Sequence, residues 1–91
     1  MTIQWLFDVI QDRKQNPSEK SYTTSLFNDG LPKIAQKVGE EGTEVVVAAL
    51  AQSDQRLIEE VADLTYHVLV LLAVRGLTPA DVAVELEKRH R

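Results

Sequence analysis

Residues 60–72 read Glu-Val-Ala-Asp-Leu-Thr-Tyr-His-Val-Leu-Val-Leu-Leu and lie in the longest apolar-rich stretch of this 91-residue chain. Their apolar residues recur at helical spacing and predict a helix from about Gln55 to Arg75, about 30 Å long. These residues cover most of the circumference of that helix, and a helix that is apolar nearly all round is buried on several sides. Because few other helices are available in the chain to cover it, we expect a partner subunit; the alternative is a compact monomer in which the first and last helices fold over it.

A second long helix is predicted just before it, from Leu31 to about Ala51. Pro32 suits the first turn of a helix. Gly39 and Gly42 inside this helix each cost about 1 kcal/mol relative to alanine. The short link at residues 52–54 makes the two helices antiparallel neighbours, because so few residues cannot span to another position. The sequence therefore predicts an all-α fold built on a helical hairpin.

Shorter elements flank the predicted hairpin. We expect a first helix from about Thr2 to Arg13, a polar loop over residues 14–25, and a short turn over residues 25–28 that ends at Asp29-Gly30. A last helix begins at Thr78-Pro79-Ala80-Asp81, a strong start signal, and ends in the basic residues 88–91. The prediction is a single domain, residues 1–91, with four main helices around the hairpin, forming a helical bundle as a homodimer.

Composition narrows the functional classes. The chain has no cysteine, so disulfides and thiolate metal sites are excluded. Its net charge of −4 argues against non-specific binding to nucleic acid. The N-terminus lacks the pattern of a signal peptide, and the apolar stretch from Val61 to Val74 is too short to span a bilayer. We expect a cytoplasmic protein with neither nucleic acid nor membrane as a partner.

Two acidic clusters stand out within the predicted hairpin: Glu40, Glu41 and Glu44, then Glu60 and Asp63. Successive helical residues are rotated by about 100°, so Glu41 and Glu44 share one stripe, and so do Glu60 and Asp63. The clusters lie at about equal distances from the turn and can therefore face each other. Carboxylates that leave water cost several kcal/mol each unless something compensates them.

The acidic clusters allow two interpretations. Carboxylates without soft ligands favour a hard cation, Mg²⁺ or Mn²⁺, and such a site suits phosphate chemistry. A di-iron centre is disfavoured because neither cluster contains a Glu-x-x-His pair. The alternative is a solvated acidic face on a non-enzymatic dimerisation module, since charged pairs at this spacing are common on helix surfaces. Spacing alone leaves both open.

The residues around the clusters carry a resemblance to a known family. Residues 37–46, Lys-Val-Gly-Glu-Glu-Gly-Thr-Glu-Val-Val, residues 60–72 and Ser21-Tyr22-Thr23 resemble the phosphoribosyl-ATP pyrophosphohydrolases, within the MazG-like all-α nucleotide pyrophosphohydrolases. The resemblance covers nearly the whole chain. Gly42 departs from it, because we expect alanine there.

The resemblance implies an enzyme of the second step of histidine biosynthesis. Phosphoribosyl-ATP and water would give phosphoribosyl-AMP and pyrophosphate, with Mg²⁺ as cofactor. It implies the metal ligands and catalytic residues Glu41, Glu44, Glu60 and Asp63, while Glu40 either ligates the metal or acts as base on the attacking water. It also implies the stand-alone form of the enzyme. In some organisms this enzyme is fused to a second enzyme that binds zinc through cysteines, and this chain contains no cysteine.

Substrate-binding residues are expected outside the carboxylates. The candidates are Lys37, Ser21, Tyr22, Thr23, Arg13 and Arg89. For the two arginines a solvated surface role is an equal alternative, and for Tyr22 the alternative to stacking on a base is packing over the hairpin. His67 is expected to be a hydrogen-bonded core or interface residue. The competing enzymatic reading is a MazG-like enzyme that clears unusual nucleoside triphosphates.

Overall fold

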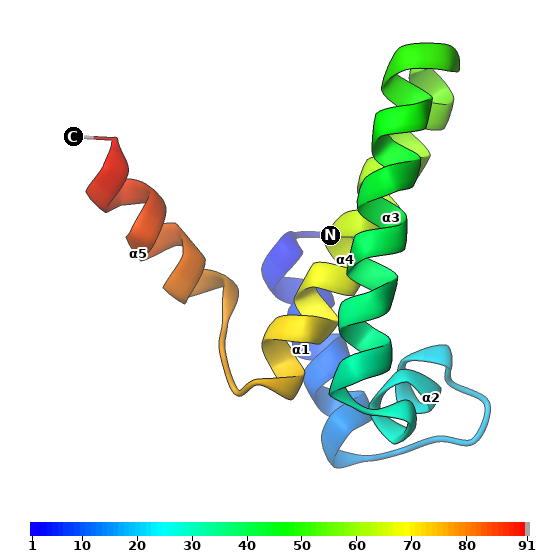
Figure 1. Ribbon diagram of the computed structural model, residues 1–91. Helices are drawn as coiled ribbons and strands as arrows, with labels where there is room; N and C mark the ends of the chain where they lie inside the picture. Colours follow the sequence, from blue (N-terminus) through cyan, green and yellow to red (C-terminus); the bar gives the residue numbers. More distant parts are fainter. Residues whose placement is uncertain (91) are drawn as a thin grey trace.

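Five α-helices make up the described part of the chain, residues 1–90 of a computed structural model (Figure 1). They are α1 Ile3–Gln15, α2 Tyr22–Asp29, α3 Leu31–Ala51, α4 Asp54–Val74 and α5 Pro79–Arg89. No strand occurs among these residues, which confirms the predicted all-α class. Arg91, from the predicted basic end of the last helix, lies outside the described residues.

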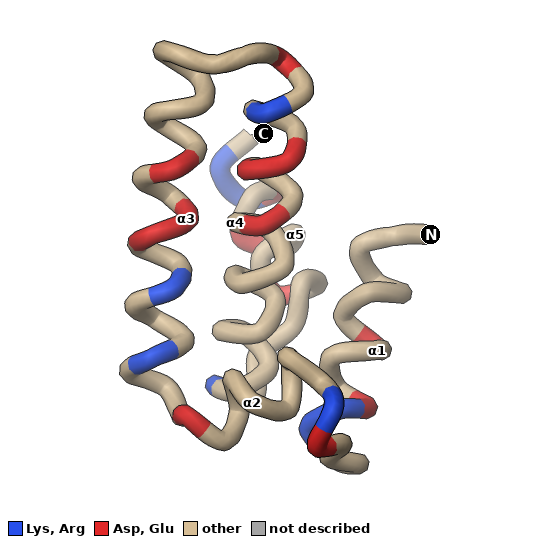
Figure 2. Tube along the Cα trace, turned by 90° about the vertical axis from the view of Figure 1, so that its right-hand side faces the viewer, with Lys and Arg blue, Asp and Glu red and all other residues tan. Residues whose placement is uncertain are grey.

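The two longest helices, α3 and α4, pack side by side as the predicted antiparallel hairpin (Figures 1 and 2). The Gln52 N–H donates to the Ala48 carbonyl at 3.1 Å and closes the end of α3. The Ser53 hydroxyl accepts from the Arg56 N–H at 3.2 Å and caps the start of α4. Because α3 ends and α4 begins at this short link, residues equally far from the link on the two helices lie at the same height.

The segment that precedes α3 differs from the prediction. Residues 22–25 were expected in a loop, but α2 begins at Tyr22, so there are five helices rather than four. The Ser21 hydroxyl accepts from the Thr24 N–H at 3.2 Å as an N-cap, and Thr24 and Leu26 are buried. The segment has too few apolar residues to display a helical period, so only packing reveals its helix. Helix α1 likewise continues to Gln15, two residues beyond the prediction.

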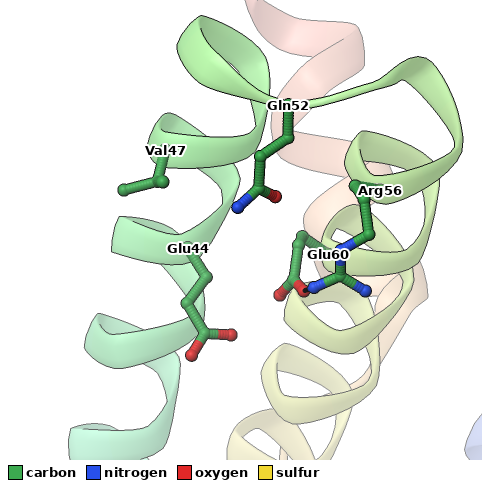
Figure 3. Close-up of a pocket in the computed structure, with 5 residues that line it drawn as sticks. All are labelled: Glu44, Val47, Gln52, Arg56 and Glu60. Carbon is green, nitrogen blue, oxygen red and sulfur yellow. Dashed lines mark hydrogen bonds and ion pairs between the residues drawn. The ribbon is translucent and has the colours of Figure 1, made fainter.

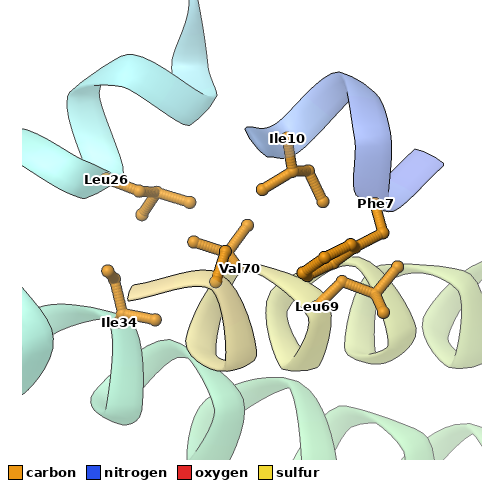
Figure 4. Packing of buried hydrophobic residues seen from close by; sticks show 7 residues of the cluster. Phe7, Ile10, Leu26, Ile34, Leu69 and Val70 are labelled. Atoms are coloured by element: carbon orange, nitrogen blue, oxygen red, sulfur yellow. The ribbon is translucent and has the colours of Figure 1, made fainter. Parts of the chain in front are cut away.

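The hydrophobic core lies at the end of the hairpin away from the turn. There α1 and α2 cover α3 and α4 (Figure 4). The buried residues of this cluster are Phe7, Ile10, Leu26, Ile34, Leu69, Val70 and Ala73. Residues 41–44 and 60–63 lie nearer the turn, beyond this core. The acidic clusters are therefore placed on a part of the hairpin that α1 and α2 leave open.

Large apolar side chains remain exposed on the outer faces of the structure. On the hairpin, Leu50 is 83% exposed and Ile58 is 63% exposed. Helix α5 projects away from the hairpin, and none of its described side chains is buried (Figure 1). A Cβ added at Gly42 would meet no atom within 4 Å, so contacts in the described chain do not explain this glycine. The partner subunit remains a prediction.

No helix within residues 1–90 combines the length and the apolar character needed to cross a membrane.

Candidate metal centre

Three of the predicted ligands converge between α3 and α4. Glu41, Glu60 and Asp63 each offer a carboxylate oxygen, and the three oxygens lie within 4.8 Å of one another. Glu41 and Glu60 are each only 6% exposed, whereas Asp63 faces solvent. Figure 2 shows the acidic segments of the two helices at similar heights along the hairpin. The register of the hairpin thus brings together residues 19 or more positions apart in the chain, as predicted.

Two buried carboxylate oxygens of this cluster have no partner. Oε2 of Glu41 and Oε2 of Glu60 make no hydrogen bond within residues 1–90. An unpaired buried polar atom costs about 1–3 kcal/mol, and more where it is charged. An oxygen-only donor set of this kind fits a hard divalent cation such as Mg²⁺ or Mn²⁺. Glu41, Glu60 and Asp63 are therefore the residues that could hold one.

The second oxygen of each buried glutamate faces a cation on its own helix. Lys37 Nζ lies 3.6 Å from Oε1 of Glu41. Arg56 donates through Nη2 to Oε1 of Glu60 (Figure 3). Both pairs join residues four positions apart, one turn of a helix. The two helices thus neutralise one side of the cluster and leave the other side free.

Electrostatic crowding is visible at Glu60. The adjacent Glu44 carboxyl raises the pKa of Glu60 above its ordinary value, because a protonated Glu60 can share a hydrogen bond with it. Burial of Glu60 adds to this effect. Arg56 acts in the opposite direction but does not cancel the effect. Burial tends to lower the pKa of Lys37, but Tyr22 and the acids one turn along α3 outweigh it and raise that pKa. The cluster carries more negative charge than its own cations balance.

Glu44, the fourth predicted ligand, stands beside the cluster rather than within the closest group. It is exposed and lines a pocket of about 240 Å³ near the hairpin turn, together with Val47, Gln52, Arg56 and Glu60 (Figure 3). Because Glu60 belongs to both the pocket and the cluster, the two are adjacent. A ligand in this pocket would contact the carboxylate cluster directly.

A hydrogen-bonded aromatic group connects α2 to the helix that carries Asp63. Nδ1 of His67 lies 2.7 Å from the Asp63 carbonyl oxygen, which can only accept, so Nδ1 carries the proton. In the neutral ring Nε2 then accepts from the Tyr22 hydroxyl at 3.1 Å. His67 is buried, and the structure confirms the expected hydrogen-bonded core histidine. The hydroxyls of Thr23 and Tyr66 form a hydrogen bond between the same two helices. Burial raises the pKa of Tyr66.

The remaining predicted substrate residues are not gathered at the cluster. Ser21 caps α2. Arg13 pairs with Asp12 at 2.8 Å, and Arg89 pairs with Glu85 at 3.2 Å on the projecting α5. Glu40 is exposed on the open side of α3, and its Oε1 lies 4.0 Å from Lys37 Nζ.

One residue of the pocket, Arg56, is absent from the sequence-based candidates. It precedes Glu60 by four positions, as Lys37 precedes Glu41. The same spacing rule that singled out Lys37 would therefore have found it. Gln52, which also lines the pocket, lies in the hairpin link, where no periodicity marks it.

Comparison with known proteins gives a consistent result. A family model described as phosphoribosyl-ATP pyrophosphohydrolase matches residues 4–90. The phosphoribosyl-ATP pyrophosphatase of Sulfurisphaera tokodaii is 54% identical over 86 residues, which cover 94% of this chain and 92% of that protein. The protein of the same name from Lacticaseibacillus casei is 55% identical over 85 residues, 93% of this chain and 77% of that protein. The histidine biosynthesis bifunctional protein HisIE of Xylella fastidiosa is 49% identical over 83 residues, 91% of this chain and 40% of that protein.

Proposed function

The chain belongs to the phosphoribosyl-ATP pyrophosphohydrolase family, and from this premise we propose the reaction that its carboxylate cluster performs. The chain hydrolyses the α–β phosphoanhydride of phosphoribosyl-ATP to phosphoribosyl-AMP and pyrophosphate, the second step of histidine biosynthesis. The observation that supports this most directly is the convergence of three carboxylates with two unpaired buried oxygens. Such a site suits a substrate with a charged phosphate chain, because a cation held by the carboxylates would bind the phosphate oxygens.

Mg²⁺ is the cofactor we propose for this site. Glu41, Glu60 and Asp63 would hold it, and Glu44 would add a further oxygen from the pocket side. When bound, Mg²⁺ supplies positive charge that neutralises the phosphate oxygens of the leaving pyrophosphate. Lys37 lies one turn from Glu41 and would meet the same phosphates from the other side of the cluster.

The remaining chemistry falls to groups around the cluster. Hydrolysis needs a base to take a proton from the attacking water. Glu40 is the proposed base, because it is exposed on the open side of α3 and is the acidic neighbour of Glu41. Tyr22 is about half exposed beside Tyr66 and offers a ring face for the substrate's base. The hydrogen bond between the Tyr22 hydroxyl and His67 would hold α2 close to the cluster while substrate binds.

We also propose that the working form is a homodimer. Val46 and Leu50 lie one turn apart on α3, and Ile58 and Val61 lie on α4; all four are exposed in the single chain. Clustered apolar residues of this kind mark an interaction surface in small helical proteins. A second copy would bury them and complete the helical bundle, because a 91-residue chain has only a small core of its own.

The proposed reaction is tested with two adjacent glutamates, of which Glu60 is buried and Glu59 is exposed. Glu60→Gln should reduce pyrophosphate release from phosphoribosyl-ATP by more than about a hundredfold, because the proposed cation that would stabilise transition-state charge loses a ligand. Glu59→Gln is the matched control, because Glu59 is exposed and also contacts Arg56. Near wild-type turnover in Glu60→Gln would contradict the ligand assignment. Faster hydrolysis of dUTP or dCTP than of phosphoribosyl-ATP by the wild-type chain would contradict the substrate.

A further inference from the structure

Arg56 is the basic residue among the five that line the pocket beside the carboxylate cluster (Figure 3). Its guanidinium donates to Glu60 through Nη2 and to Glu59 through Nη1. The Arg56 side chain is half exposed, whereas the Glu60 side chain is almost completely buried. Arg56 therefore has one partner inside the cluster and one on the surface.

The two contacts of Arg56 differ in what holds them. The pair with exposed Glu59 contributes little, because solvent screens an ion pair on the protein surface. The pair with Glu60 compensates a buried charge, which is costly to leave alone. A divalent cation held by the cluster would neutralise the Glu60 carboxylate, so Glu60 would no longer need the guanidinium as its counter-ion. A cation at the cluster and the Arg56–Glu60 contact would therefore compete for the same carboxylate.

The pocket needs a cation of its own if it is to accept an anion. Glu44 and Glu60 on its wall repel phosphate, and Gln52 offers only a neutral amide. A guanidinium presents its donors in a planar fork that matches phosphate oxygens in pairs. Arg56 lines the pocket and is therefore placed to supply this fork when it no longer pairs with Glu60.

Arg56 and Lys37 stand on opposite sides of the cluster. Each precedes its glutamate by one turn, and α3 and α4 run antiparallel, so the two cations flank the carboxylates along the hairpin axis. A phosphate chain that crosses the cluster would meet one cation at each side. The pocket on the Arg56 side, near the turn, is the space available to its free end.

We propose that Arg56 exchanges partners during the reaction: it pairs with Glu60 in the metal-free protein and holds the departing pyrophosphate in the substrate complex. This assignment rests on the proposed function. Water breaks the α–β phosphoanhydride, one proton of the water passes to a carboxylate base, and the pyrophosphate leaves through the pocket that Arg56 lines. Arg56 is thus a substrate-contacting residue as well as the counter-ion of Glu60.

Calorimetry with Mg²⁺ and pyrophosphate tests the exchange without turnover. In Arg56→Gln, Mg²⁺ alone should bind at least as tightly as in the wild type, because the competing cation is gone. Pyrophosphate added to the Mg²⁺-saturated variant should bind about 10–100-fold more weakly, the value of a charge-assisted hydrogen bond. Arg56→Lys should keep the wild-type affinity for Mg²⁺ and recover part of the affinity for pyrophosphate. Arg75→Gln, which removes the same charge at the other end of α4, should change neither.

Equal affinity of Arg56→Gln and the wild type for pyrophosphate would overturn the proposal. Loss of Mg²⁺ binding in Arg56→Gln would also overturn it, because Arg56 would then be holding the cluster together. Circular dichroism checks folding, and Arg56→Lys carries the test if the glutamine variant unfolds. Phosphoribosyl-ATP turnover is measured separately on the wild type. A wild type that binds Mg²⁺ and pyrophosphate through Arg56 but does not hydrolyse phosphoribosyl-ATP would refute the proposed function and leave the Arg56 assignment standing.

Discussion

Glu41 and Glu60 each keep one oxygen paired and one oxygen unpaired inside the hairpin. Helical spacing predicted that Lys37 would reach Glu41, because residues four apart lie on one face of a helix. The same spacing could not show that each glutamate leaves its second oxygen without a partner. That property depends on side-chain rotamers and on what the opposite helix places nearby.

The environment of Glu60 predicts how the metal-free protein responds to pH. Its pKa is raised above the ordinary 4.5, so between that value and the raised pKa the folded chain binds more protons than the unfolded chain. Stability from this group is complete below pH 4.5 and is lost as pH rises through the raised pKa. In EDTA, Glu60→Gln should therefore not show this loss of stability with rising pH. Its melting temperature should exceed that of the wild type at pH 7.

The neighbouring residue provides the control for this measurement. Hydrogen bonds from Gln55 and Arg56 lower the pKa of Glu59, the opposite direction. Glu59→Gln should therefore not raise the melting temperature at pH 7. If Glu60→Gln melted below the wild type in EDTA at that pH, the crowding of carboxyls at the cluster would not be the dominant effect.

Among the helices, α2 depends most on local capping. It has only 8 residues, and isolated helices of that length are not stable in water. Its stability comes from the Ser21 cap, from burial of Leu26, and from the contact of Tyr22 with His67. The predicted loop over residues 14–25 was wrong from Tyr22 onward, because the burial of Leu26 and the Tyr22–His67 contact depend on residues distant in the chain.

The Ser21 cap can be separated from a role in binding substrate. Ser21→Ala should lower the free energy of unfolding by about 1 kcal/mol, the usual cost of losing an N-cap. Ser21→Asn keeps a capping oxygen and should restore most of this loss in urea denaturation. Unchanged stability in Ser21→Ala, together with a raised KM for phosphoribosyl-ATP, would mean that Ser21 serves the substrate rather than the helix.

In the molecule as a whole, the core lies at the end of the hairpin away from the turn, and the carboxylate cluster lies near the middle of the hairpin (Figures 2 and 4). Helices α1 and α2 cover the end away from the turn, while the part nearer the turn carries the pocket and exposed apolar residues. The part of the hairpin nearer the turn is therefore the part with the least packing of its own. A partner subunit would supply that packing.

The dimer is tested by its mass and by one change on the exposed face. Light scattering should give about twice the 10.2 kDa of the single chain. Leu50→Glu places a charge on the proposed interface and should shift the mass toward that of one chain, whereas Gln55→Glu, on the exposed first turn of α4, should not. A mass of one chain at every concentration would refute the dimer and leave Leu50 as an ordinary exposed residue.

Amino-acid order alone was enough for the all-α class, for the bounds of α3 and α4 to within one residue, and for the register that brings Glu41, Glu60 and Asp63 together. These features follow from helical periodicity and from a short turn, which are local properties of the chain. Tertiary structure alone revealed the helix at Tyr22, the unpaired oxygens of the glutamates, and Arg56 as a wall of the pocket. Those features depend on side-chain rotamers and on contacts between helices, which helical periodicity does not describe.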